Sequence, residues 1–296
     1  MILLSIITPH YNMPDTLRRL IDSIPEDDRI EHIIVDDKSD IDGKKLADAR
    51  AYAAAKGSIW IDNTTEVKGT GTCRDLGIQK ATGKWIIIAD SDDYFTKDAF
   101  EIMHRYTDDE ADVIYFAPTS IRESDGGMSS RHVPYKKLVD RFVTDPGQES
   151  EMRLRYLSVP DTSKMIRRSL ITENGIKSSV SPVANDVMFS VRCAYHAKSV
   201  KATSDVIYCI TESEGTLTTT KNKERFRKRI DVYIEQAGFL KEHLPESAYA
   251  DTRISARTLV LQSLMDYGVK EFIHTIKHLR EKHAPVNPLA IKVRRR

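Results

Sequence analysis

The chain has little of what marks secreted, membrane-spanning or nucleic-acid-binding proteins. Only three of its 296 residues are cysteines (Cys73, Cys193 and Cys209), and their number and spacing fit neither a disulfide framework nor a metal-binding pair. We therefore expect free, buried thiols in a reducing compartment. No segment approaches the roughly 20 apolar residues of a spanning helix. The apolar opening lacks a basic leader and soon meets Pro9, so we expect a strand there and not a signal peptide.

The charges of the chain almost cancel. Its 45 lysines and arginines face 44 aspartates and glutamates, for a formal charge of +1, and this balance gives no overall signal for nucleic-acid binding. With 40% hydrophobic residues, a chain of this length can bury a sizeable core. We expect a cytoplasmic protein that binds no nucleic acid.

Strand-like and helix-like segments alternate through the first half of the sequence. The expected strands are 3–8, 30–35, 58–61, 84–89 and 112–117. The expected helices are 15–24, 44–56, 72–81 and 97–106. This alternation predicts right-handed βαβ units, and so an α/β fold with a mostly parallel sheet. The periodicity of residues 121–160 is uninformative.

The expected fourth strand ends in a cluster of carboxylates, Asp90, Asp92 and Asp93, with Ser91 among them. Open α/β sheets bind ligands at the carboxyl ends of their strands. Three anions so close together repel one another and resist desolvation, and a divalent cation held by oxygen ligands is the usual compensation. The cluster therefore predicts a metal that binds a diphosphate. Taken alone, however, the motif is explained equally well by an acidic surface turn.

Two neighbouring strand ends carry groups suited to a nucleoside. Tyr11 follows the first strand and is expected to stack on a planar base. An aspartate after the second strand, Asp36 or Asp37, can accept hydrogen bonds from a base imide or from ribose hydroxyls. The sequence has no Gly-x-Gly-x-x-Gly after the first strand and no P-loop. Because no such glycine-rich loop is available to bind the phosphates, we expect a metal to contribute more to their binding. Alternatively, the polar groups at the three strand ends belong to unrelated surface turns and do not form one shared site.

Two charged residues stand where helices are expected to begin. Arg74 follows a glycine-bearing turn, where it can face a phosphate or simply pair with a neighbouring acid. Asp186 lies at the start of a later helix, and an N-cap role worth about 1 kcal/mol explains it without any chemistry. From the residues alone, the N-cap interpretation is favoured for Asp186.

Taken together and in order, these motifs resemble those of the family 2 glycosyltransferases, which have the GT-A fold. The resemblance implies a Rossmann-like, mixed, mostly parallel sheet flanked by helices. The matching segments are 5–12, 33–40, 71–78, 81–86, 90–93 and 185–187. The similarity covers roughly residues 1–220 and implies an inverting transfer of a sugar from a nucleotide-diphosphate sugar, with a UDP-sugar preferred. The acceptor implied is a hydroxyl of a glycan or lipid-linked glycan in cell-surface polysaccharide or glycolipid synthesis.

The resemblance also implies roles for individual residues. Asp186 is the expected general base, and Asp92 the expected ligand of Mn²⁺ or Mg²⁺. The expected donor-binding residues are Pro9, Tyr11, Asp37, Arg74, Asp90, Ser91 and Asp92, supported by Asp36, Asp93 and Asn185. Two positions depart from the family pattern: Asn185 stands where glutamate is usual, and Asp75 where asparagine commonly follows the arginine.

Residues 1–220 are expected to form the nucleotide-sugar-binding and catalytic domain, and 221–296 a basic, helical extension. In the extension Val269, Phe272, Ile273, Ile276 and Leu279 make one helical stripe. Packing on the body is the favoured explanation. The alternative is peripheral contact with the inner face of the plasma membrane through the basic helices and the tail 294–296.

Two other functions compete with sugar transfer. A non-catalytic protein that binds sugar nucleotides, or a scaffold, would not need both Asp92 and Asp186. A sugar nucleotidyltransferase would carry a glycine- and arginine-rich loop after the first strand, and this chain has none there. The identity of the sugar, the acceptor position and the oligomeric state are left open.

Overall fold

The computed structural model describes residues 1–213 and 221–286. Its main sheet has the strand order β3-β2-β1-β4-β8-β6-β9. The strands are β1 (Leu4–His10), β2 (Ile30–Asp36), β3 (Ile59–Asp62), β4 (Trp85–Ile88), β6 (Val113–Phe116), β8 (Lys164–Arg167) and β9 (Val200–Thr203). β8 runs antiparallel to both its neighbours, and the other pairings are parallel. The predicted mixed, mostly parallel sheet is thus confirmed.

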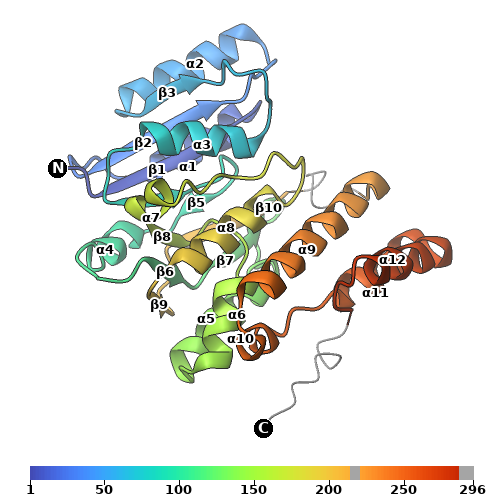
Figure 1. Ribbon diagram of the computed structural model, residues 1–296. Coiled ribbons are helices and arrows are strands. Elements are labelled where there is room, and N and C mark those ends of the chain that lie inside the picture. The colour runs from blue at the N-terminus through green and yellow to red at the C-terminus, as the bar shows by residue number, and fades with distance from the viewer. Residues whose placement is uncertain (214–220, 287–296) are drawn as a thin grey trace.

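Helices cover both faces of this sheet (Figure 1). On one face α3 (Thr70–Lys80), α7 (Arg168–Glu173) and α8 (Asn185–His196) share an apolar cluster with the strands. On the other face lie α1 (Pro14–Asp22) and α4 (Ala99–His104), and α2 (Gly43–Ala55) packs beside α1. The expected strands and helices of the first 117 residues are all present, with ends shifted by a few residues.

A second, three-stranded sheet has the order β5-β10-β7 and was not predicted. It contains β5 (Tyr94–Phe95), β7 (Thr119–Arg122) and β10 (Tyr208–Glu212). The uninformative stretch 121–160 holds α5 (Val133–Thr144) and α6 (Gln148–Leu157). Because β5 follows the acidic cluster directly, that cluster is held between the two sheets.

Close contact between α3 and the sheet depends on Gly77. A Cβ atom added there would lie 2.4 Å from Cγ2 of Ile7 on β1 and 3.4 Å from Cγ2 of Val35 on β2. Side chains larger than hydrogen would therefore hold the helix away from the sheet. The glycine sits one turn after Arg74 on the same helix, so its small size also sets how near Arg74 comes to the strand ends.

The C-terminal helices are α9 (Lys223–His243), α10 (Glu246–Asp251), α11 (Arg257–Tyr267) and α12 (Val269–Glu281). They share an apolar cluster with α6 and α8, and no described helix is long and apolar enough to cross a membrane. The predicted division after residue 220 and the tail 294–296 lie outside the described residues.

The stripe expected on α12 does not face the body as a whole. Leu279 is buried, but Val269 and Ile273 are 62% and 60% exposed, while Glu271 is buried. Glu271 accepts hydrogen bonds from Nε and NH2 of Arg227 at 2.7 and 2.8 Å, and Lys223 Nζ lies 2.8 Å from its carboxylate. The prediction was wrong at these positions because two cations of α9 make an acidic side chain acceptable on the inner face.

Candidate active site

The acidic loop between β4 and β5 is fixed by β10. The backbone N–H of Asp90 donates to the hydroxyl of Tyr208 at 2.8 Å, and Asp93 Oδ1 accepts from the backbone N–H of Thr211 at 2.7 Å. Tyr208 and Asp93 are both buried. The loop therefore has a defined shape, set by a strand more than 100 residues further along the chain.

The three carboxylates of this loop have different surroundings. Asp90 pairs with Arg74, and Asp93 is occupied by Thr211, whereas Asp92 forms no ion pair with another described residue. Burial and the nearby charge of Asp90 raise the pKa of Asp92 to about 6, although Arg131 and Arg19 oppose this rise. Asp92 is thus the partly exposed carboxylate of the loop that has no ion-pair partner among the described residues.

This arrangement fits a hard divalent cation bound at Asp92. Mg²⁺ is commonly held by one or two carboxylates together with substrate phosphates and water. Within residues 1–213 and 221–286, no group of three histidine, cysteine or acidic side chains converges on one point. A cation at Asp92 would therefore have fewer than three such side-chain ligands and would need further oxygen ligands, such as substrate phosphates or water.

Arg74 links the acidic loop to the start of α8. Its NH2 lies 3.0 Å from Asp90 Oδ1, and its NH1 donates to Asn185 Oδ1 at 2.5 Å. Its Nε lies 3.0 Å from Asp161 Oδ2, close enough for an ion pair but not aligned for a hydrogen bond. Burial alone would lower the pKa of Arg74, but Asp161, Asp90 and Asp186 outweigh burial and raise it. Because its nitrogens already have these partners, its contact with a phosphate stays a prediction.

Asp186 lies in the first turn of α8 and is not its N-cap. The helix begins at Asn185, the cap residue is Ala184 in the left-handed region with φ of 51°, and no side chain caps the helix. The favoured N-cap interpretation was therefore wrong. Asp186 is partly exposed, and the charged groups that shift its pKa include Arg74, Asp90 and Lys164. Burial and the charge of Asp90 raise that pKa, and the two cations oppose the rise.

Two buried charged residues near Asp186 were missed by the sequence reasoning. Asp161 is 1% exposed and lies just before β8, and Lys164, the first residue of β8, is 3% exposed. Lys164 Nζ donates to the backbone oxygen of Ser158 at 2.6 Å and to Ser190 Oγ on α8 at 3.2 Å. The available signal was a lysine directly before the apolar residues Met165 and Ile166.

The expected nucleoside groups lie at the ends of β1 and β2. Asp36 is occupied by His10, whose Nδ1 lies 2.8 Å from its Oδ1, and by Ser39, which donates from N at 3.0 Å and from Oγ at 2.6 Å. Asp37 Oδ1 accepts from Asn63 Nδ2 at 2.8 Å. Asp36 therefore shapes the turn, while Asp37 keeps unused acceptor capacity for a ligand.

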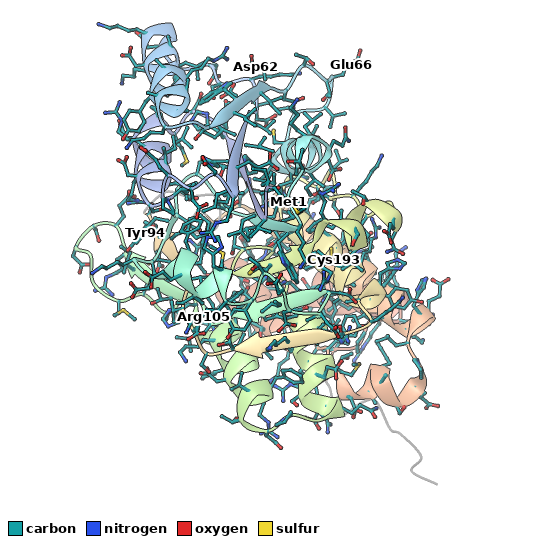
Figure 2. The ribbon with its side chains drawn as sticks, turned by 90° about the vertical axis from the view of Figure 1, so that its left-hand side faces the viewer. Met1, Asp62, Glu66, Tyr94, Arg105 and Cys193 are labelled. Atoms are coloured by element: carbon teal, nitrogen blue, oxygen red, sulfur yellow. The ribbon has the colours of Figure 1, made fainter. Side chains whose placement is uncertain are left out.

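Tyr11 is the exposed aromatic group at this edge. Its hydroxyl donates to Asp40 at 3.1 Å, and Lys68 Nζ lies 3.7 Å from its ring centroid. Pro9 and Ser91 are buried beneath the expected donor site. In Figure 2, Asp62 and Glu66 mark the β3 side of the sheet at the top of the molecule, and Cys193 on α8 lies lower. The expected donor groups thus follow the strand ends from β2 through β1 to β4.

Comparisons with known proteins agree with this geometry. Residues 5–173 match the family model described as Glycosyl transferase family 2. The chain is 26% identical to the "Putative glycosyltransferase EpsH" of Bacillus subtilis over 81% of this chain and 69% of that protein. It is 25% identical to the "Poly(ribitol-phosphate) beta-glucosyltransferase" of Bacillus spizizenii over 69% of this chain, but spans only 31% of that relative.

Solved structures show the same fold. Staphylococcus aureus TarS 1–349 in complex with UDP-GlcNAc matches with a TM-score of 0.72 and 19% identity, covering 95% of this chain and 81% of that one. A mannosyltransferase from Pyrobaculum calidifontis in complex with GDP-Man and Mn²⁺ matches with a TM-score of 0.59 and 13% identity over 94% of this chain and 75% of that one. Since the family model covers more than half of the sequence, the chain belongs to glycosyl transferase family 2.

Proposed function

We propose that the protein is a metal-dependent, inverting glycosyltransferase that uses a nucleotide-diphosphate sugar, preferably a UDP-sugar. The acceptor is a hydroxyl of a glycan or lipid-linked glycan in cell-surface polysaccharide or glycolipid synthesis. One observation carries the proposal: Arg74 contacts both Asp90 of the acidic loop and Asn185, the neighbour of Asp186. The guanidinium that pairs with the donor-side carboxylate therefore also holds the residue next to the expected base, and the charge of Asp186 acts on the same arginine.

The residues of the candidate site have separate roles in a single displacement reaction. Tyr11 stacks on the nucleotide base, and the Asp37 carboxylate accepts a hydrogen bond from the same base. Asp186 accepts the proton of the acceptor hydroxyl while that oxygen forms a bond to the anomeric carbon, a step worth about 10²- to 10⁴-fold. The bond from that carbon to the diphosphate oxygen breaks, and its electron pair leaves with the nucleoside diphosphate. Asp92 would hold a divalent cation, which when bound would supply charge neutralisation for this leaving group.

Relatives support the proposed chemistry. TarS has been solved with UDP-GlcNAc and with UDP, and the Pyrobaculum calidifontis enzyme with GDP-Man and Mn²⁺. The curated relatives include an enzyme named for poly(ribitol-phosphate). These names support a nucleotide-sugar donor, a divalent metal and a cell-surface polymer as acceptor.

Replacing Asp186 by asparagine tests the proposed base. We expect UDP-sugar binding to stay near the wild-type value and transfer to fall at least about a hundredfold, because asparagine has a similar shape but cannot take the proton. Asp145→Asn is the matched control, since Asp145 lies after α5 in a largely exposed ion pair with Arg141. Turnover of Asp186→Asn within a few-fold of the control would reject Asp186 as the base.

Replacing Asp92 by alanine tests the metal. We expect the variant to bind UDP equally with Mn²⁺ or EDTA, while the wild type binds more tightly with Mn²⁺. Equal affinities for the wild type in both conditions would contradict metal-dependent donor binding. Binding without turnover across a broad acceptor panel would favour a scaffold, and release of pyrophosphate from a nucleoside triphosphate would favour a nucleotidyltransferase.

We also propose peripheral membrane contact through the outer side of α11 and α12, which lie side by side beyond α9 (Figure 1). Their exposed apolar residues are Leu261, Leu264, Met265, Val269 and Ile273. Exposed Lys270 and Lys277 belong to the same hairpin, and each cation near an anionic surface adds about 1 kcal/mol of attraction. This docking would bring the enzyme to the inner face of the plasma membrane, beside a lipid-linked acceptor.

Vesicle co-sedimentation tests the membrane contact. We expect the protein to sediment with vesicles containing phosphatidylglycerol, and Met265→Asp combined with Val269→Asp to abolish this. Val143→Asp, at an exposed apolar position on α5, is the control. Equal sedimentation of the double variant and the control would exclude this surface.

A further inference from the structure

Two buried charges, Asp161 and Lys164, have no place in the chemistry described so far. Both come from the short segment that leads into β8, the antiparallel strand between β4 and β6. Asp161 reaches Arg74 Nε at 3.0 Å, and Lys164 reaches Ser190, one helical turn after Asp186 on α8. Burying an ion costs several kcal/mol unless it is well paired, so two such residues in one short segment require an explanation.

We infer that Asp161 and Lys164 are positioning residues of the transfer reaction. Asp161 fixes the guanidinium of Arg74 between Asp90 and Asn185. Lys164 fixes the first turns of α8 through its hydrogen bond to Ser190. Together they hold Asp186 beside the acidic loop in the state that can accept a proton. The inference rests on the proposed function, because it assigns these two residues to the base of that reaction.

The geometry gives each residue a separate task. Arg74 has one partner in each of three chain segments: Asp90 after β4, Asp161 before β8 and Asn185 at the start of α8. Lys164 has one partner in each of two chain segments: the backbone oxygen of Ser158 after α6, and the hydroxyl of Ser190 in α8. Since each cation is buried and multiply held, neither can swing away when a substrate enters.

Asp161 is unsuited to be the base itself. It is 1% exposed and faces Arg74, whereas Asp186 is partly exposed. An acceptor hydroxyl has to come within about 3 Å of the group that takes its proton, and a fully buried carboxylate does not allow this approach. Asp161 therefore acts on the reaction through Arg74 and Asp186.

The charges around Asp186 predict opposite effects for the two residues. The charged and titratable groups around Asp186 are Arg74 from α3, Asp90 from the acidic loop, Asp161 and Lys164 from the β8 segment, and Tyr135 from α5. Lys164 favours the carboxylate form and so lowers the pKa of Asp186, whereas the anion of Asp161 disfavours a second anion beside it. Because the acids interact, a kinetic profile reports them as a group.

The test is the pH dependence of kcat/KM for sugar transfer, measured with the full chain. Lys164→Gln keeps a donor for the Ser158 oxygen but removes the charge, so we expect the acid limb of the profile to move up by about one pH unit. Asp161→Asn is expected to move it down. We expect kcat of Lys164→Gln on the acid limb to fall about tenfold and its KM for the UDP-sugar to change less than twofold, and Lys164→Arg to restore the profile.

Controls separate this inference from a general loss of structure or of function. Lys137→Gln and Asp145→Asn remove exposed charges from α5 and its end, and neither should move the profile. If the wild type transfers no sugar, the proposed function fails. If the wild type transfers sugar and binds UDP but both buried variants, folded by circular dichroism, keep its profile and kcat, the positioning role is overturned. Should Lys164→Gln not fold, Asp161→Asn alone decides, because an unmoved acid limb contradicts the inference.

Discussion

Replacing Gly77 by alanine is expected to push α3 away from the sheet. The new Cβ would lie 2.4 Å from Ile7 Cγ2, whereas non-bonded carbons pack at about 3.5–4.0 Å. Ile7 is fully buried on β1, which is paired on both sides, by β2 and β4. A β-branched side chain in a central strand has little rotamer freedom, so the helix and not the strand has to move.

The expected loss follows from two opposing terms. Overpacking of a well-packed core costs about 1–3 kcal/mol, while alanine in place of glycine in a helix gains about 1 kcal/mol. Gly238→Ala isolates the second term, because Gly238 lies within α9 and an added Cβ would meet nothing within 4 Å. Gly77→Ala should therefore be less stable than Gly238→Ala by about 1–3 kcal/mol.

Urea unfolding followed by circular dichroism measures this difference. The Gly238→Ala variant should unfold at a higher urea concentration than the wild type, and Gly77→Ala at a lower one than Gly238→Ala. Because α3 carries Arg74, Gly77→Ala should also reduce sugar transfer. Equal unfolding midpoints for the two variants would refute the close contact between α3 and β1.

Three further predictions concern the nucleotide, the C-terminal helices and the metal. Asp37→Asn should weaken UDP binding at least about tenfold in calorimetry, because a charged hydrogen-bond acceptor is worth about 1.5–3 kcal/mol, and unchanged affinity would remove Asp37 from the donor site. Hydrogen bonds from Arg227 lower the pKa of Glu271 from 4.5 to about 2, so its stabilising effect is present above about pH 4.5 and is lost as the pH falls through about 2. Unfolding midpoints of Glu271→Gln should accordingly depend less on pH in this range than those of the wild type, and parallel curves would contradict this. Removing divalent metal with EDTA should abolish the rise in melting temperature that a UDP-sugar produces, and Mn²⁺ should restore it; a rise that survives EDTA would show metal-independent binding.

Much of the fold could be predicted because its strands are continuous apolar runs. Residues 85–88 are buried on both faces, and such strands are recognisable without an alternating pattern. The small sheet was missed because β5 has only two residues and pairs with a strand more than 100 residues away. Short strands carry too few residues for a periodicity, so their existence depends on tertiary contacts.

The site could be predicted less completely than the fold. Asp90, Asp92 and Asp186 belong to recognisable motifs, but Asp161 is a single acid whose meaning comes from Arg74, which lies far away in the sequence. The exposed and buried sides of α12 were assigned wrongly for a similar reason, since Arg227 and Lys223 lie on another helix. Side chains that matter through a distant partner leave little local signal in a sequence.

The hydrogen bond from Arg74 to Asn185 spans 111 residues. During synthesis on a ribosome, the strands β1, β2 and β4 emerge well before α8. A nascent chain, or a fragment stopped at residue 173 where the family match ends, would present Tyr11, Asp37 and Asp92 without Asp186. Such a fragment would also lack β10, whose Tyr208 and Thr211 hold the acidic loop, so both carboxylate groups of the candidate site reach their final arrangement only after this late strand has been made.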